Sequence, residues 1–176
     1  MDARGMIVDG ILHGTFDMEE IESASREWKE KQISVILEAV EEISNKRLMD
    51  LSIGYLEFAK KYVSSGDNSC KRESSRIVGN LASRYPQALG DCIPALLENA
   101  KAEGTVIRWG SAYALSRIIV LEEYANTDLY EILAAICENE PENGVKNQYL
   151  KALKKIGNRR KKPGLPTHAE GSGPFD

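Results

Sequence analysis

The sequence is poor in the residues on which most catalytic and metal sites depend. Its 176 residues include two histidines and three cysteines. The histidines, His13 and His168, lie near opposite ends of the chain, which argues against a catalytic triad built on histidine. The sequence also lacks a Gly-rich phosphate loop, a CxxC or HExxH pair and a Gly-x-Ser-x-Gly turn. We therefore predict no enzymatic activity, no cofactor and no metal.

Long apolar runs are missing as well. No stretch of about 18 apolar residues is present to cross a bilayer. The first residues, MDARGMIVDGILHG, carry acids within their apolar stretch and have no basic lead, so they do not resemble a signal peptide. We therefore expect no membrane segment and a cytoplasmic location.

The remaining titratable groups fit structural roles. The cysteines are odd in number and far apart, so we predict buried thiols rather than disulfides or metal ligands; they are Cys70, Cys92 and Cys137. Two groups of acids lie near expected helix ends, and we interpret them as solvated faces rather than as acid–base pairs. These are Glu38, Glu41 and Glu42, and Glu138, Glu140 and Glu142.

What the sequence does contain is an internal repeat around residues 91–121, which are predicted to form two helices joined by a turn at Gly104. A shift of the second helix back by 37 positions aligns small and apolar residues, namely Ser111, Ala114, Leu115 and Ile118 with Ser74, Ile77, Val78 and Leu81. The first helix aligns with residues 128–137 at the same offset, and the second aligns with residues 145–156 at 38. A fixed period of this length is typical of stacked helical repeats.

The repeat resembles the HEAT family. The resemblance rests on the run Ile93-Pro94, Leu96-Leu97, Val106-Ile107-Arg108, Ala112, Ala114-Leu115 and Ile118, and it extends over about residues 47–157. GTVIRW, with SSRIVGNLA upstream, is similar to small prokaryotic HEAT-like proteins of unassigned function. The resemblance implies an all-α fold, an α-α superhelix or solenoid of about four helical hairpins. Gly104-Thr105 replaces the acidic residue that often precedes the Val-Arg pair in the family, which leaves the usual polar ladder between repeats in doubt.

The domain boundaries follow from composition and helix signals. We expect one HEAT-like domain at residues 1–157 and a disordered, basic, Gly- and Pro-rich tail at residues 158–176. Acids outnumber bases by seven between Met1 and Ser44. Asp17 and Glu20 form a capping-box pattern, but one helix or two are equally consistent with residues 17–44. Further helices are expected at residues 46–64 and 68–85, with Asp91 capping the helix that follows.

The second helices of the repeats supply a candidate binding groove, because in a HEAT stack they line the concave side. Trp109 and Tyr113 lie four residues apart on one ridge. The equivalent residues are Arg72 and Arg76 in the preceding repeat and Asn147 and Lys151 in the following one, and a second row comprises Lys71, Arg108 and Lys146. This composition suits an acidic peptide, an acidic helix or phosphate groups. In the structural alternative, Arg108 bonds to carbonyls of the adjacent turn and Trp109 packs against the next repeat.

Three functions remain open at the level of sequence. The first is a non-enzymatic interaction module or adaptor that binds a protein partner, such as an acidic peptide or helix, in the groove. The second is nucleic-acid binding or base excision, as in HEAT-like alkylpurine DNA glycosylases; the acidic body speaks against it. The third is a small-molecule enzyme resembling the HEAT-like phycobilin lyases. Self-association through the ends of the stack, head to tail, is a further possibility.

Overall fold

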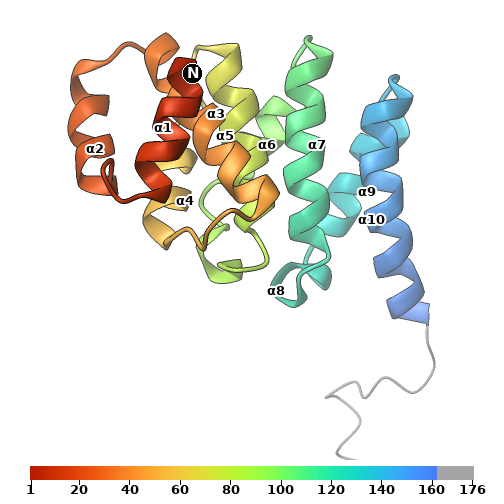
Figure 1. Cartoon of the computed structure of the whole chain (residues 1–176). Coiled ribbons are helices and arrows are strands. Elements are labelled where there is room, and N and C mark those ends of the chain that lie inside the picture. Colours follow the sequence, from red (N-terminus) through yellow and green to blue (C-terminus); the bar gives the residue numbers. More distant parts are fainter. Residues whose placement is uncertain (162–176) are drawn as a thin grey trace, which may run out of the picture.

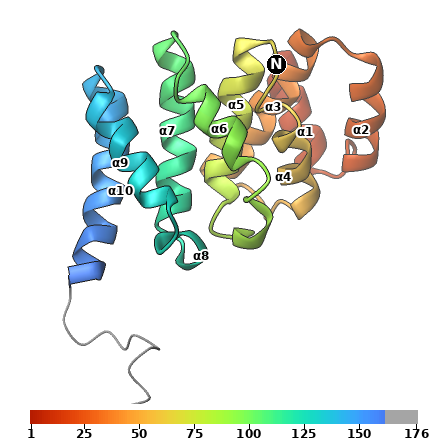
Figure 2. The same ribbon diagram turned by 180° about the vertical axis from the view of Figure 1, so that it is seen from behind.

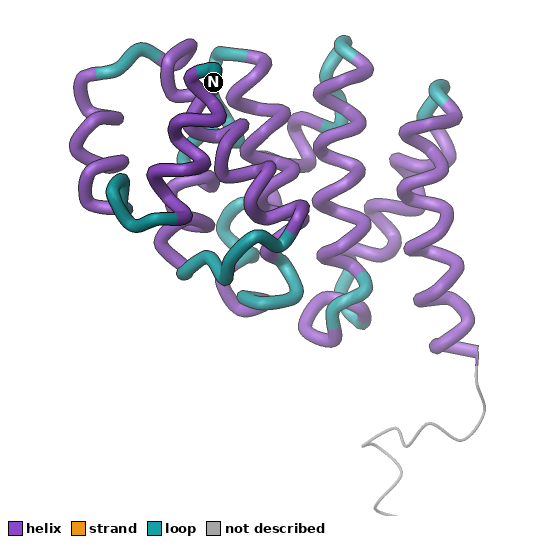
Figure 3. Tube along the Cα trace, viewed as in Figure 1, coloured by secondary structure: helices purple, strands orange, loops and turns teal. Residues whose placement is uncertain are grey.

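The chain folds into helices joined by short loops. The computed structural model describes residues 1–161, which contain ten α-helices and no strand. The helices are α1 Ala3–Leu12, α2 Met18–Glu27, α3 Glu30–Lys46, α4 Ile53–Lys60, α5 Asn68–Leu81, α6 Ile93–Asn99, α7 Thr105–Ile119, α8 Glu122–Ala125, α9 Leu129–Asn139 and α10 Asn143–Lys161, with a 3₁₀ turn at Pro86–Ala88. The all-α prediction is confirmed for this part of the chain (Figure 3).

The helices form two layers. One row runs α1, α3, α5, α7 and α10, and each of these helices packs against the next (Figure 1). The shorter helices α4, α6 and α9 lie behind the row, where they pack on α5, α7 and α10 respectively (Figure 2). Helix α2 packs against α4. The long helices of the row therefore offer one open side that the second layer does not cover.

The repeat positions form the core between these layers. The aligned residues of α5 and α7 are all buried, and they include Ser74 and Ser111 at 0% exposure. Small residues let the two helices approach closely: a Cβ atom added to Gly79 would lie 2.7 Å from Tyr113 Cδ1 and 3.2 Å from Ala114 Cα. The Ser111 hydroxyl donates a hydrogen bond to the carbonyl of Leu96 in α6, and the Ser74 hydroxyl donates to the carbonyl of Lys71 at 3.1 Å, so both buried serines have a partner.

The N-terminal segment forms two helices rather than one. Trp28 ends α2 in an extended conformation with ψ 143°, and α3 begins at Glu30. The Asp17–Glu20 capping box is confirmed, with Glu20 N–H donating to Asp17 Oδ1 at 3.0 Å. Residue Arg47 then leaves α3 in the left-handed region at φ 53°.

Several predicted boundaries are wrong. The helix expected from residue 46 begins at Ile53, because α3 itself extends to Lys46. Asp91 does not cap α6, whose N-cap is Cys92. The Asp91 carboxylate instead forms an ion pair with Lys60, with Oδ1 and Nζ 2.7 Å apart. Helix α10 continues past Gly157 to Lys161, since no αL exit occurs at that glycine. The rest of the predicted tail, residues 162–176 with His168, lies outside the described residues.

Candidate functional site

The open side of the row carries a column of alternating guanidinium and aromatic groups across α5 and α7. The Arg76 guanidinium lies 5.8 Å from the Trp109 ring centroid. Trp109 stacks on Tyr113, with centroids 5.3 Å apart and an interplanar angle of 28°. The Arg117 guanidinium lies over the Tyr113 ring, 3.4 Å from its centroid. Trp109 and Tyr113 are half-buried, so each ring retains a surface that a partner can contact.

Tyr113 links this column to α5 and, through α5, to α3. Its hydroxyl donates a hydrogen bond to Asn80 Oδ1, and Asn80 Nδ2 donates to Ser44 Oγ at 3.0 Å. Burial raises the pKa of the Tyr113 phenol above its ordinary value of 10.0, which keeps it protonated as a donor. The column is therefore held at a fixed position relative to three helices.

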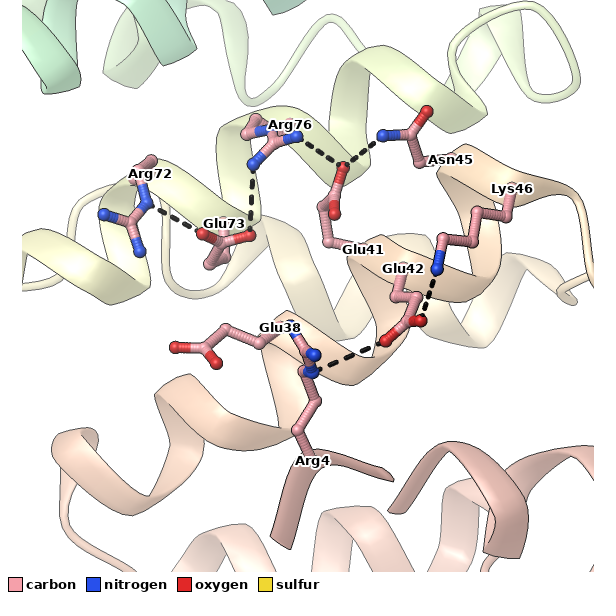
Figure 4. A pocket seen from close by; sticks show the side chains of 9 residues that line it. All are labelled: Arg4, Glu38, Glu41, Glu42, Asn45, Lys46, Arg72, Glu73 and Arg76. Carbon is pink, nitrogen blue, oxygen red and sulfur yellow. Dashed lines mark hydrogen bonds and ion pairs between the residues drawn. The ribbon is translucent and has the colours of Figure 1, made fainter. Parts of the chain in front are cut away.

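Arg72 and Arg76 are engaged within the protein. Arg76 Nη2 lies 3.0 Å from Glu41 Oε1, and Arg72 Nε donates to Glu73 Oε1 at 2.7 Å. The two carboxylates are nearly buried, with side chains 10% and 5% exposed. Figure 4 shows these pairs in a cavity of about 350 Å³ that acidic and basic side chains line in equal number. A cavity so balanced in charge has no preference for an anion or a cation.

Arg108 has the structural role and is not a groove residue. Its Nε and Nη2 donate to the Glu140 carboxylate at 3.0–3.3 Å. Its Nη1 donates to the carbonyls of Ala102 and Glu103 at 3.0 and 2.7 Å. Arg108 and Glu140 are 13% and 3% exposed. Glu140, from the loop before α10, thus provides the polar link between successive helix pairs that the sequence left in doubt.

Helix α10 places Asn147 and Lys151 at the positions equivalent to Trp109 and Tyr113, and Lys146 at the position equivalent to Arg108. Asn147 and Lys151 are exposed and Lys146 is half-buried. One further turn along the same ridge, the register of 37 and 38 residues aligns Asn80, Arg117 and Lys155. Arg117 and Lys155 are exposed, but they were not predicted as groove residues from the sequence. Extending the four-residue spacing of Trp109 and Tyr113 by one step would have found them.

Charge is distributed unevenly in the C-terminal part of the described chain. The part of α10 up to Arg159 carries Lys146, Lys151, Lys154, Lys155 and Arg159 and no acid. The segment 121–142 in the second layer carries no base; its acids are Glu122, Glu123, Asp128, Glu131, Glu138, Glu140 and Glu142. The overall charge of −4 therefore combines a basic α10 with an acidic segment that directly precedes it.

The other candidate chemistry is structural. All three cysteines are free and buried, as predicted. Glu42 pairs with Lys46 and Arg4 at 2.7 and 3.4 Å. His13 is exposed and its ring contacts the carbonyl of Asp9. Across residues 1–161, no three histidine, cysteine or carboxylate side chains gather in a way that would hold a metal ion.

None of the helices in the described part of the chain has the length and apolar character needed to cross a bilayer. Comparisons with family models, curated proteins and solved structures found no match to this chain.

Proposed function

We propose that the chain is a non-enzymatic binding module, built as a HEAT-like solenoid, that takes an acidic peptide or helix of a partner protein along α5, α7 and α10. The repeat register and the packing of α4 on α5, α6 on α7 and α9 on α10 support the HEAT-like reading. The observation that carries the function is the column of Trp109, Tyr113 and Arg117, which Arg76 supports from α5 and which continues on α10 as Lys151 and Lys155.

The chemistry of this surface favours a protein partner. Tryptophan, tyrosine and arginine are the residue types that contribute most to protein interfaces. Aromatic rings offer a large contact area that loses little conformational entropy on binding. The lysines of α10 add a positive potential that attracts an acidic segment and speeds its association. The groove residues that take part are Trp109, Tyr113, Arg117, Lys146, Asn147, Lys151 and Lys155, whereas Arg72, Arg76 and Arg108 support them from within the fold.

Affinity capture from lysate of the source cells tests this function. We expect the immobilised chain to retain a specific protein that both Trp109→Ala and the double variant Lys151→Glu/Lys155→Glu lose. The matched control is Lys61→Glu/Lys101→Glu, which makes the same charge change at exposed residues paired with Glu22 and Glu98 outside the groove. Equal capture by all four proteins, each shown to be folded by circular dichroism, would contradict the proposal.

Nucleic-acid binding is the second candidate, and the absence of acids from α10 up to Arg159 favours it specifically. Phosphate contacts by Lys151, Lys154 and Lys155 would make affinity fall steeply with salt. Fluorescence anisotropy with a labelled single-stranded oligonucleotide at rising salt concentrations measures this slope. In the affinity capture, a protein that remains bound to the chain after nuclease treatment of the lysate would identify a protein partner instead.

A further inference from the structure

A second cavity lies where the C-terminal ends of α3, α5 and α7 meet, and its charge is one-sided. Its volume is about 290 Å³. The charged residues that line it are Arg47 and Arg117, and within the described part of the chain no acid lines it. This distinguishes it from the balanced cavity around Glu41 and Arg76. A cavity lined by two arginines and no carboxylate has a composition that suits an anion.

The side chain of Arg117 and the backbone of Arg47 are both held in place. The Arg117 guanidinium lies over the Tyr113 ring, 3.4 Å from its centroid, and its Nη1 donates to the Tyr113 carbonyl at 3.3 Å. The backbone of Arg47 is fixed at the end of α3, because its N–H donates a hydrogen bond to the Ile43 carbonyl. Neither side chain has an acidic partner within the described part of the chain, and both are exposed. The guanidinium group of Arg117, held on the ring in this way, loses less conformational freedom on binding than a free side chain.

The charges of Arg47 and Arg117 also complement the carbonyl ends of α3 and α7. That effect alone accounts for an arginine near either helix end, but it does not require the two to line one cavity. The rest of the lining provides apolar and polar contacts side by side. The apolar part of the wall comes from Val120, Leu121 and the backbone of Gly79, and Ser83 adds an exposed hydroxyl.

We propose that this cavity binds the side-chain carboxylate of a glutamate from the acidic partner, with Arg47 and Arg117 as the groups that hold it. The methylene groups of a glutamate fit against Val120 and Leu121, while its carboxylate accepts hydrogen bonds from the guanidinium edges. Arg117 belongs both to this cavity and to the column with Tyr113. The proposal therefore rests on the proposed function and fixes one anchoring point of the bound segment.

The test is a titration followed by NMR of the arginine Nε–Hε and backbone amide signals. The probe is hexaglutamate with acetylated and amidated ends, so that its only charged groups are side-chain carboxylates. We expect saturable shifts at Arg47, Arg117 and the Gly79 and Ser83 amides. Arg47→Gln and Arg117→Gln should each weaken binding about tenfold. Arg26→Gln, which removes the same charge from an exposed position on α2, should leave the affinity unchanged.

Arg117→Lys keeps the charge but removes the planar fork, so we expect it to weaken binding several-fold and to fold normally. Affinity equal to the wild type in both glutamine variants would overturn the proposal. Shifts confined to Lys151 and Lys155 would also overturn the proposed glutamate site, but they would still support the proposed function. The absence of any saturable shift would overturn both the glutamate site and the proposed function. Inorganic phosphate serves as the second probe, and binding of phosphate without hexaglutamate would overturn the carboxylate assignment.

Discussion

At the scale of single residues, the basic side chains fall into two groups with different physics. Arg108 is almost enclosed and satisfies a buried carboxylate and two backbone carbonyls. Arg117 stacks on an aromatic ring and keeps an edge in solvent. Removal of one partner from an enclosed ion pair destabilises the fold, because the other charge is left buried and unpaired. An exposed guanidinium on a ring remains available for a ligand.

Removing the Arg108 side chain should be strongly destabilising. Arg108→Ala leaves the Glu140 carboxylate buried without its partner, and we expect the free energy of unfolding to fall by about 3–5 kcal/mol. Urea unfolding followed by circular dichroism measures the change. Lys101→Ala is the control, because Lys101 and Glu98 form an exposed pair with side chains 69% and 75% exposed, and such pairs contribute little. A loss below about 1 kcal/mol for Arg108→Ala would contradict the structural role.

At the scale of elements, the close approach of α5 to α7 sets the geometry of the column. Gly79 faces the Tyr113 ring so closely that a methyl group would require the ring to move. Because Tyr113 carries both the Trp109 stack and the Arg117 contact, a displaced ring alters the whole surface. A glycine inside a helix is otherwise unfavourable by about 1 kcal/mol relative to alanine, so its presence here reflects packing.

Gly79→Ala should therefore destabilise the protein despite the better helix propensity of alanine. Overpacking costs typically about 1–3 kcal/mol, and we expect a net loss at the lower end of that range together with altered Tyr113 ring signals in NMR. Gly144→Ala is the control, since a Cβ atom there meets nothing within 4 Å, and it should be neutral or stabilising. Equal unfolding midpoints for both variants would show that the ring adjusts without cost.

At the scale of the whole molecule, burial in the core changes the titration of cysteine and tyrosine side chains. Burial raises the pKa of the Cys70 thiol to about 12 and that of Cys92 to about 11, against an ordinary value of 9.0. Burial also raises the pKa of Tyr55, Tyr62 and Tyr124. These groups stay neutral in the folded chain at a pH where the unfolded chain ionises.

We therefore predict that stability declines in alkali. Above pH 9 the unfolded chain binds fewer protons than the folded chain, so the free energy of unfolding falls as pH rises. The contribution of the two thiols is complete below pH 9 and is lost on the way to pH 11–12, the range of their folded-state pKa values. Each thiol accounts for roughly 2 kcal/mol near pH 10.5. Urea midpoints at pH 8 and pH 10.5 measure the decline, and Cys70→Ala/Cys92→Ala should reduce it. Constant midpoints in the wild type would refute the prediction.

Much of the fold followed from the sequence because it depends on short-range spacing. The apolar periodicity of residues 107–118 and its copies at 37 and 38 positions marked the buried stripes of α5, α7 and α10. The same register placed Trp109 and Tyr113 on one ridge, and the structure has their rings stacked. The boundary at Ile53 was missed, since Leu48 and Leu51 extend an apolar spacing that the chain does not use as helix.

The sequence by itself determined which segments are helical and which of their faces are buried, because both properties are set by residues three or four apart. Only the tertiary structure decided which charges are free. Arg108 meets Glu140 across 32 residues, and Arg76 meets Glu41 from a different helix. Arg108 and Arg76 are thus paired with buried carboxylates, whereas Arg117, on the same helix as Arg108, has no acidic partner within the described part of the chain. Ion pairing depends on the position of side chains that only the packed helices bring together.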